Sequence, residues 1–137
     1  TGPNHSGAKL HGFLSYLVKI SLAKKKYSLI GYKGKQVRDN LHSYDLVNAF
    51  WEFFKKPTKG EVYNIGGGRY SNCSIIEALN LVENIAGISI KREILKIPRV
   101  GDHIWYISNL SKFKKHYPHW QQKYNIKKII EELINNF

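Results

Sequence analysis

The chain has 137 residues, of which 42% are hydrophobic and 13% are aromatic. This size and apolar content suit one compact domain, residues 1–137, and exclude a wholly disordered chain. No stretch approaches the roughly 20 apolar residues that cross a bilayer, and the first residues lack the pattern of a secretion signal. The single Cys73 excludes an internal disulfide. We therefore expect a cytoplasmic protein without a membrane segment.

The formal net charge is +12. Such a charge suits three kinds of partner, namely nucleic acid, an anionic membrane or a phosphorylated ligand. The lysines are scattered along the chain and do not form one stripe. Because a composition rich in Lys, Ile and Asn explains the charge equally well, the sequence does not favour a nucleic-acid surface.

The first third of the chain predicts one helix, one strand and a glycine-bearing turn. Apolar residues at helical spacing predict an amphipathic helix over residues 8–24. Residues 27–30 form a short apolar run that ends at Gly31, which predicts a strand. Residues 31–36 predict the turn, and residues 37–42 are expected to be extended.

A second helix is expected to begin at Ser43, whose hydroxyl can cap it, and to end before Pro57 and Gly60. Residues 61–65 then predict a short strand, which the three glycines at positions 66–68 end. The predicted buried face of this helix comprises Leu46, Val47, Phe50, Trp51 and Phe54.

Residues 74–77 predict a capping box for a third helix, which Gly87 ends. Residues 88–94 alternate between apolar and polar side chains and predict a strand. Ser108 is expected to cap a short helix, and residues 126–134 predict the last helix. Strands that alternate with helices predict an α/β fold, with short strands and about five helices.

Two arginines lie in segments that could bind an anion. Arg38 follows the first glycine turn, and Arg99 lies in a loop beside Gly101 and Asp102. A guanidinium group binds phosphate oxygens through two parallel hydrogen bonds, so two such loops that meet would clamp a diphosphate. Asp39 could hold the Arg38 side chain in place. The plainer interpretation is an ion pair within each loop.

Other motifs give weaker evidence for a functional site. The glycines at 66–68 precede a helix whose N-terminus could bind phosphate, but the G-x-G-x-x-G dinucleotide pattern is absent, and a simple turn is the plainer interpretation. The six histidines lack supporting Cys or carboxylate ligands, so we expect no metal site. No Gly-x-Ser-x-Gly nucleophile motif occurs.

Residues 31–46 resemble the G-x-G-x-Q-x-R-D-x-x-x-V-x-D segment of the extended short-chain dehydrogenases/reductases. Residues 62–68 resemble the strand and glycine loop that follow in this family, and residues 99–102 resemble its late R-x-G-D phosphate loop. Order and spacing agree over essentially the whole chain. The resemblance implies the C-terminal, substrate-binding lobe of a Rossmann-type enzyme, with the N-terminal dinucleotide-binding half missing.

The family resemblance implies an NAD-dependent epimerase or dehydratase that acts on a nucleoside-diphosphate sugar. NAD would bind the N-terminal half of the full-length enzyme, so we expect no cofactor, no catalytic residue and no turnover for this chain alone. Residues 11–17, the Arg38 segment and residues 101–105 are most similar to the CDP-sugar 2-epimerases of the family. The expected ligand is therefore a nucleotide sugar, with a CDP-sugar favoured.

Carried over by position, the resemblance assigns Arg38 and Arg99 to the diphosphate. The other residues expected to bind substrate are Ser28 and Ile30 at the base and ribose, Phe13 and His11 at the border of the nucleotide, and Gln36 at the ribose.

The family uses a catalytic Tyr-x-x-x-Lys pair, and Tyr124 and Lys128 match this pattern literally. We reject this match because it lies in the last predicted helix, where Lys128 falls off the apolar face. Helix faces that would pack on the missing Rossmann half are expected to be exposed and to promote homo-oligomers.

Three other functions stay open at the level of sequence. The chain could be a non-enzymatic module that binds a nucleotide sugar, or a basic module that binds RNA. It could also be the equivalent lobe of a nucleotide-sugar 4-epimerase or dehydratase, because the missing half largely sets the reaction type.

Overall fold

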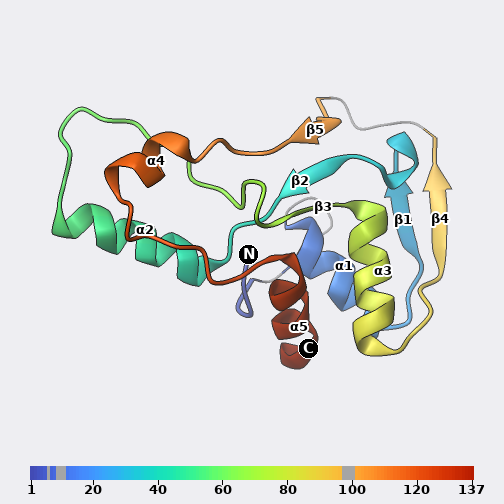
Figure 1. Ribbon diagram of the computed structural model, residues 1–137. Coiled ribbons are helices and arrows are strands. Elements are labelled where there is room, and N and C mark those ends of the chain that lie inside the picture. The colour runs from blue at the N-terminus through green and yellow to red at the C-terminus, as the bar shows by residue number, and fades with distance from the viewer. Residues whose placement is uncertain (6, 9–11, 97–100) are drawn as a thin grey trace.

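A computed structural model describes residues 1–5, 7–8, 12–96 and 101–137 of the chain (Figure 1). The helices in these residues are α1 (Phe13–Leu22), α2 (Ser43–Lys55), α3 (Ile75–Ala86), α4 (Ser111–His116) and α5 (Ile126–Asn136). The strands are β1 (Tyr27–Ile30), β2 (Val37–Asp39), β3 (Asn72–Ser74), β4 (Arg92–Leu95) and β5 (Trp105–Tyr106). The expected α/β fold with five helices and short strands is confirmed.

The strands form two small sheets. β1 pairs in parallel with β4, from Tyr27 opposite Arg92 to Ile30 opposite Leu95. β2 lies between β3, which is antiparallel to it, and β5, which is parallel to it. β3 and β5 were not predicted, because strands of two or three residues are too short to show periodicity.

The larger hydrophobic core joins α1, α3 and α5 to β1, on the right of Figure 1. The predicted apolar faces of these three helices lie in it. Its completely buried side chains include Leu17, Val18, Leu79, Val82, Ile129, Ile130 and Leu133. Burial of each such side chain is worth about 1.5–3 kcal/mol, so this core supplies most of the apolar stabilisation of the chain.

A smaller core lies at the other end of the molecule, between α2, α4 and the chain that follows α4. It consists of Ala49, Leu110, Phe113, Tyr117 and Trp120. The rings of Phe113 and Trp120 meet edge to face, with centroids 5.2 Å apart. This is a favourable geometry for an aromatic pair, and it holds the chain after α4 against that helix.

Asp45 connects the two ends of the molecule. Its buried carboxylate accepts hydrogen bonds from the backbone N–H groups of Lys123 and Tyr124, at 2.9 and 3.1 Å. Its carbonyl oxygen accepts one from the indole of Trp120 at 3.0 Å. The chain leading into α5 is therefore held to the first turn of α2.

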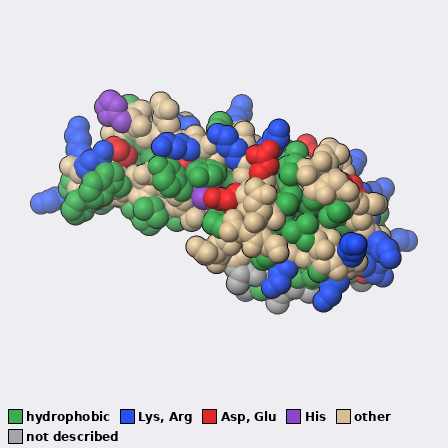
Figure 2. All heavy atoms as spheres, turned by 90° about the horizontal axis from the view of Figure 1, so that it is seen from below, with side chains coloured by type: hydrophobic (Ala, Val, Ile, Leu, Met, Phe, Trp, Pro, Cys, Tyr) green, Lys and Arg blue, Asp and Glu red, His purple; other side chains and the backbone are tan. Residues whose placement is uncertain are grey.

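The predicted buried face of α2 is wrong. Val47, Phe50, Trp51 and Phe54 are between 55 and 72% exposed, whereas Ala49 and Asp45 are buried. The exposed four side chains follow helical spacing and form one stripe, which we call the α2 stripe. No described element packs on this stripe. Figure 2 shows hydrophobic side chains gathered at the end of the molecule that carries α2.

Two predicted helix caps differ from the structure, and one is confirmed. His42 and not Ser43 caps α2, because its Nδ1 accepts the Tyr44 N–H. Ser108 does not cap α4, whose N-cap position is Leu110. The capping box before α3 is present, and Gly87 ends that helix in the left-handed conformation, at φ 62°. The expected strand at 61–65 has no strand partner among the described residues.

Burial should make the only cysteine of the sequence unreactive. Cys73 is 3% exposed, and desolvation, with a smaller contribution from Glu77, raises the pKa of its thiol to about 12. Because the thiolate is the nucleophile, we expect iodoacetamide at pH 8 to modify the native chain at least tenfold more slowly than the urea-unfolded chain. Mass spectrometry of timed samples measures both rates. Equal rates would contradict the packing of β3.

Candidate nucleotide-binding cavity

Arg38 is held by a residue from the distant R-x-G-D loop. Its Nη2 donates to Asp102 Oδ1 at 2.6 Å, and its Nη1 donates to the carbonyl oxygen of Val37 at 2.7 Å. Both charged side chains are only 20% exposed. The pairing of β2 with β5 brings these residues together across 64 positions of sequence. The guanidinium group is thus fixed before any ligand binds.

Asp39 is not the partner of Arg38, contrary to expectation. Neighbouring residues of a strand point to opposite faces, so the two side chains diverge. Asp39 Oδ2 accepts the backbone N–H of Gly68 at 2.8 Å and that of Ser108 at 3.0 Å. Its carboxylate therefore joins the glycine loop to the chain that follows β5.

The glycine loop at 66–68 is a packed turn. A Cβ at Gly67 would lie 2.2–2.6 Å from backbone atoms of Ser71 and Asn40, so only glycine fits there. The carbonyl oxygens of Gly66 and Gly67 both accept from Gln122 Nε2. These contacts support the plainer interpretation of this motif and leave Arg38 as the candidate anion site.

A cavity of about 160 Å³ lies beside Arg38. All the predicted substrate-binding residues that the structure describes line it, and they come from four successive segments. These residues are Phe13, Ser28, Ile30, Gln36 and Arg38. The other two, His11 and Arg99, lie outside the described residues. The structure therefore brings five of the predicted side chains to one cavity. The expectation that Arg38 and Arg99 bind the same diphosphate stays a prediction.

Sequence reasoning missed four residues that line this cavity, namely Tyr16, Tyr27, Leu29 and Ile75. Tyr16 lies one helical turn after Phe13, and this spacing could have identified it. Its ring lies 6.1 Å from that of Tyr27. Asp102 also lines the cavity, so the acid that orients Arg38 belongs to its wall.

Gln36 lines the cavity and has a buried acceptor without a partner among the described residues. Its Nε2 donates to the carbonyl oxygen of Ile30 at 2.9 Å, and the side chain is buried. Gln36 Oε1 has no hydrogen-bond partner among the described residues. A buried acceptor without a partner costs free energy, so a ligand hydroxyl that donates to it would be stabilised.

Ser28 is oriented by the neighbouring strand. Its Oγ donates to Glu93 Oε1 at 2.7 Å, across the parallel pair of β1 and β4. The serine oxygen keeps its acceptor capacity toward a ligand. The cavity thus offers one oriented hydroxyl and one unpartnered carbonyl beside aromatic and aliphatic walls.

A second cavity of about 630 Å³ also borders Arg38. Arg38 and Phe13 line both cavities, and Asn40, Tyr106 and Ser108 are among the residues that line only the second of these two. A guanidinium group between two hollows can hold an anion that carries one organic group on each side. A diphosphate with a nucleoside at one end has this shape.

The literal Tyr-x-x-x-Lys match lies away from both cavities. Tyr124 stacks on His42, with ring centroids 3.9 Å apart, and Lys128 Nζ donates to the carbonyl oxygen of Lys123. Neither residue lines a described cavity beside Arg38. In the described parts of the chain, no three His, Cys, Asp or Glu residues are placed to hold a metal ion.

The α/β fold is that of the C-terminal part of Rossmann-type epimerases and dehydratases. The sequence model of the NAD dependent epimerase/dehydratase family matches residues 1–66. This match supports the resemblance to the extended short-chain dehydrogenases/reductases that the sequence predicted.

Among curated proteins, the chain is 26% identical over 125 residues to CDP-paratose 2-epimerase of Salmonella typhi, covering 90% of this chain and 36% of that enzyme. A solved structure of dTDP-glucose 4,6-dehydratase from Bacillus anthracis, in complex with NAD, is 27% identical and has a TM-score of 0.81. The match covers 98% of this chain and 40% of the dehydratase chain. UDP-glucose 4-epimerase from Thermotoga maritima, solved with UDP-glucose, is 22% identical and has a TM-score of 0.82. This match covers 100% of our chain and 42% of the epimerase chain.

The chain therefore spans about two-fifths of the length of these relatives. Their activities concern proteins that are more than twice as long. Among the described residues, no helix is long and apolar enough to cross a membrane.

Removal of the Asp39 side chain should destabilise the fold around the site. Asp39→Ala leaves two backbone N–H groups without an acceptor, and each such buried group costs about 1–3 kcal/mol. We expect the free energy of unfolding, measured by urea titration, to fall by about 2–4 kcal/mol. Glu131→Ala is the matched control and should cost about 1 kcal/mol or less, because it removes one exposed ion pair, with Lys127. Equal losses would contradict the role of Asp39.

Proposed function

We propose that the chain is the substrate-binding portion of an NAD-dependent nucleotide-sugar epimerase, in which Arg38 and Arg99 hold the diphosphate. The observation that carries the proposal is the position of Arg38. Its guanidinium group is fixed by Asp102 between two cavities, and the described residues assigned to the nucleotide line one of them.

The donors of Arg38 support a diphosphate as ligand. A guanidinium group has five N–H donors, and the two described hydrogen bonds leave three of them. These remaining donors can bind phosphate oxygens while Asp102 keeps the group in place. Arg99 precedes Asp102 by three residues in the same loop, which is why we assign the second cation to it.

The smaller cavity suits the nucleoside end of the ligand. Gln36 Oε1 would accept from a ribose hydroxyl, and Ser28 and Ile30 would lie against the base and ribose. His11 would border the nucleotide with Phe13. The larger cavity, which also borders Arg38, would take the sugar.

The proposed reaction is the epimerisation of a CDP-sugar at C2, as in CDP-tyvelose 2-epimerase, also named CDP-paratose 2-epimerase. Its support is the similarity to the Salmonella enzyme over most of this chain. The alternative is the equivalent lobe of a 4-epimerase or dehydratase, which the similarity to a solved dTDP-glucose 4,6-dehydratase and a solved UDP-glucose 4-epimerase favours. The role of the chain's own residues, to bind and orient the diphosphate, is the same in both.

NAD would supply the hydride chemistry from the N-terminal half of the complete enzyme. We assign no catalytic residue, no NAD binding and no turnover to residues 1–137 alone. In this proposal, the lobe fixes the nucleotide so that the sugar lies toward the NAD-binding half.

We further propose that the NAD-binding half covers the α2 stripe. The stripe is apolar and exposed, and in the nearby segment 61–65 Val62 is 80% exposed and no residue has a strand partner among the described residues. A Rossmann half would cover the stripe and pair with this segment. A second copy fits less well, because Lys55, Lys56 and a net charge of +12 would repel it.

Replacement of Arg38 should weaken the binding of CDP. Arg38→Gln removes charged hydrogen bonds worth about 1.5–3 kcal/mol, so the Kd measured by isothermal titration calorimetry should rise roughly ten- to hundredfold. Arg92→Gln is the matched control, since Arg92 pairs with Glu83 and lines neither cavity beside Arg38. Its Kd should stay within about twofold of that of the wild type.

The same titration separates the competing functions. An RNA-binding module would lose affinity steeply with salt and would respond to many lysines, not to Arg38 alone. Titrations with UDP and dTDP rank the affinities for the three bases. If CDP bound more weakly than UDP and dTDP, the proposed 2-epimerase would be contradicted. Wild-type affinity for every diphosphate in Arg38→Gln would overturn the nucleotide-sugar proposal itself.

Contact with an NAD-binding half should protect α2 from hydrogen exchange. We expect slower exchange in α2 and in residues 61–65 when the chain is co-expressed with the N-terminal half of a family member. The double variant Trp51→Ser with Phe54→Ser should lose this protection while its own unfolding free energy changes by less than about 1 kcal/mol. Ile94→Ser, which changes an exposed apolar residue of β4, is the control and should keep it. Unchanged exchange in the wild type would contradict this contact.

A further inference from the structure

A third cavity, of about 800 Å³, lies between the glycine loop, β5 and α4. It shares no lining residue with the cavity at Ser28 and Gln36, and it shares Ser108 with the larger cavity beside Arg38. Trp105 and Tyr106 are neighbours in β5 and point to opposite faces. Tyr106 lines the larger cavity beside Arg38, whereas Trp105 lines this one. The β5 strand therefore separates two different hollows.

Two cations line the third cavity, and no acid does. Arg69 makes no ion pair among the described residues, whereas Arg38 pairs with Asp102. Lys114 is the second cation, and its Nζ lies 6.0 Å from the ring centre of Trp120. An exposed guanidinium group without a carboxylate partner keeps its donors for an anion.

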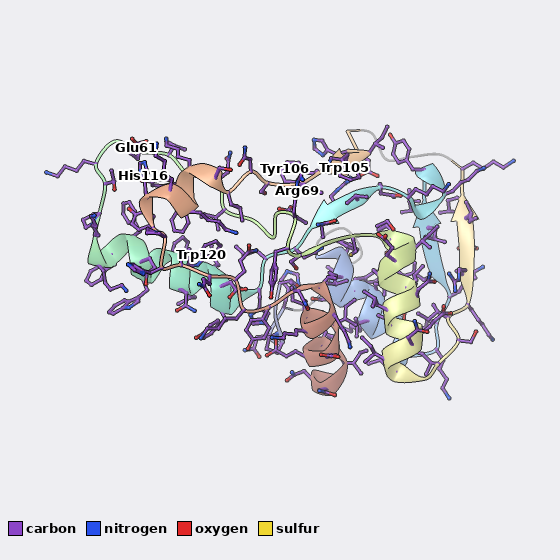
Figure 3. All side chains as sticks on the ribbon, viewed as in Figure 1. Glu61, Arg69, Trp105, Tyr106, His116 and Trp120 are labelled. Atoms are coloured by element: carbon purple, nitrogen blue, oxygen red, sulfur yellow. The ribbon has the colours of Figure 1, made fainter. Side chains whose placement is uncertain are left out.

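Two aromatic side chains lie beside these cations. Trp105 is 66% exposed and Tyr70 is 47% exposed, and both line the cavity. In Figure 3, Arg69 and Trp105 lie near each other where the glycine loop passes below β5. Large exposed aromatic faces next to free cations are the pattern with which proteins bind a planar ring that carries a phosphate.

We propose that this cavity binds a small phosphorylated ligand with a planar ring, of the nucleoside monophosphate class. Its phosphate binds Arg69 and Lys114, and its ring stacks on Trp105. A nucleic acid strand fits less well, because a strand needs a row of cations along its backbone and this cavity offers two. The site is independent of the proposed diphosphate site at Arg38.

Calorimetric titration with 5′-AMP tests the proposal. Arg69→Gln and Trp105→Leu should each raise the Kd about tenfold or more, since each removes one of the two recognition elements. Arg92→Gln is the arginine control and should leave the Kd within about twofold. All three side chains are at the surface, and circular dichroism of each variant verifies that the fold is intact.

The Arg38→Gln variant separates this site from the proposed function. We expect 5′-AMP to retain binding dependent on Arg69 in Arg38→Gln. Loss of all AMP binding in Arg38→Gln, with wild-type affinity in Arg69→Gln, would overturn the proposal. Ribose 5-phosphate, which lacks the ring, should bind at least about fivefold more weakly. Equal affinity for the two probes would also overturn it, because the aromatic side chains would then contribute nothing.

Discussion

The site depends on how the carboxylate of Asp39 holds a three-residue strand. This single group accepts backbone hydrogen bonds from the glycine loop and from the chain after β5. β2 is thereby fixed between segments that are far apart in sequence. Because successive residues of a strand face opposite sides, fixing Asp39 on one face fixes Arg38 on the other. There Asp102 completes its orientation. The candidate anion site is thus positioned by a carboxylate that does not line the cavity beside Gln36.

Local signals predicted the parts of the fold that local contacts determine. The capping box before α3 and the glycine that ends this helix involve residues three or four positions apart. The apolar face of α2 was predicted correctly as a stripe and wrongly as buried. Periodicity reports which side chains share a face, but it does not report whether another element covers that face. The expected strand at 61–65 failed for the same reason, since a strand needs a partner for its hydrogen bonds.

The candidate site was predicted from family resemblance more than from residue chemistry. Reasoning from the residues alone left the Arg38 loop open to a pair with Asp39, and the structure replaced that partner with Asp102. The residues of the cavity come from α1, β1, the turn after it and β2. No spacing rule brings such segments together. Gln36 is the clearest example, because its unpartnered oxygen is visible only once its neighbours are placed.

The two separate cores give the molecule two cooperative units of unequal size. In the larger unit, α1, α3 and α5 pack around one shared core. The smaller unit has five buried residues next to the uncovered α2 stripe. Subglobal opening is easiest where few apolar contacts must break. The smaller unit should therefore open first, and a partner seated on α2 would raise its stability selectively. Binding of such a partner and the rigidity of this end of the chain are then linked by mass action.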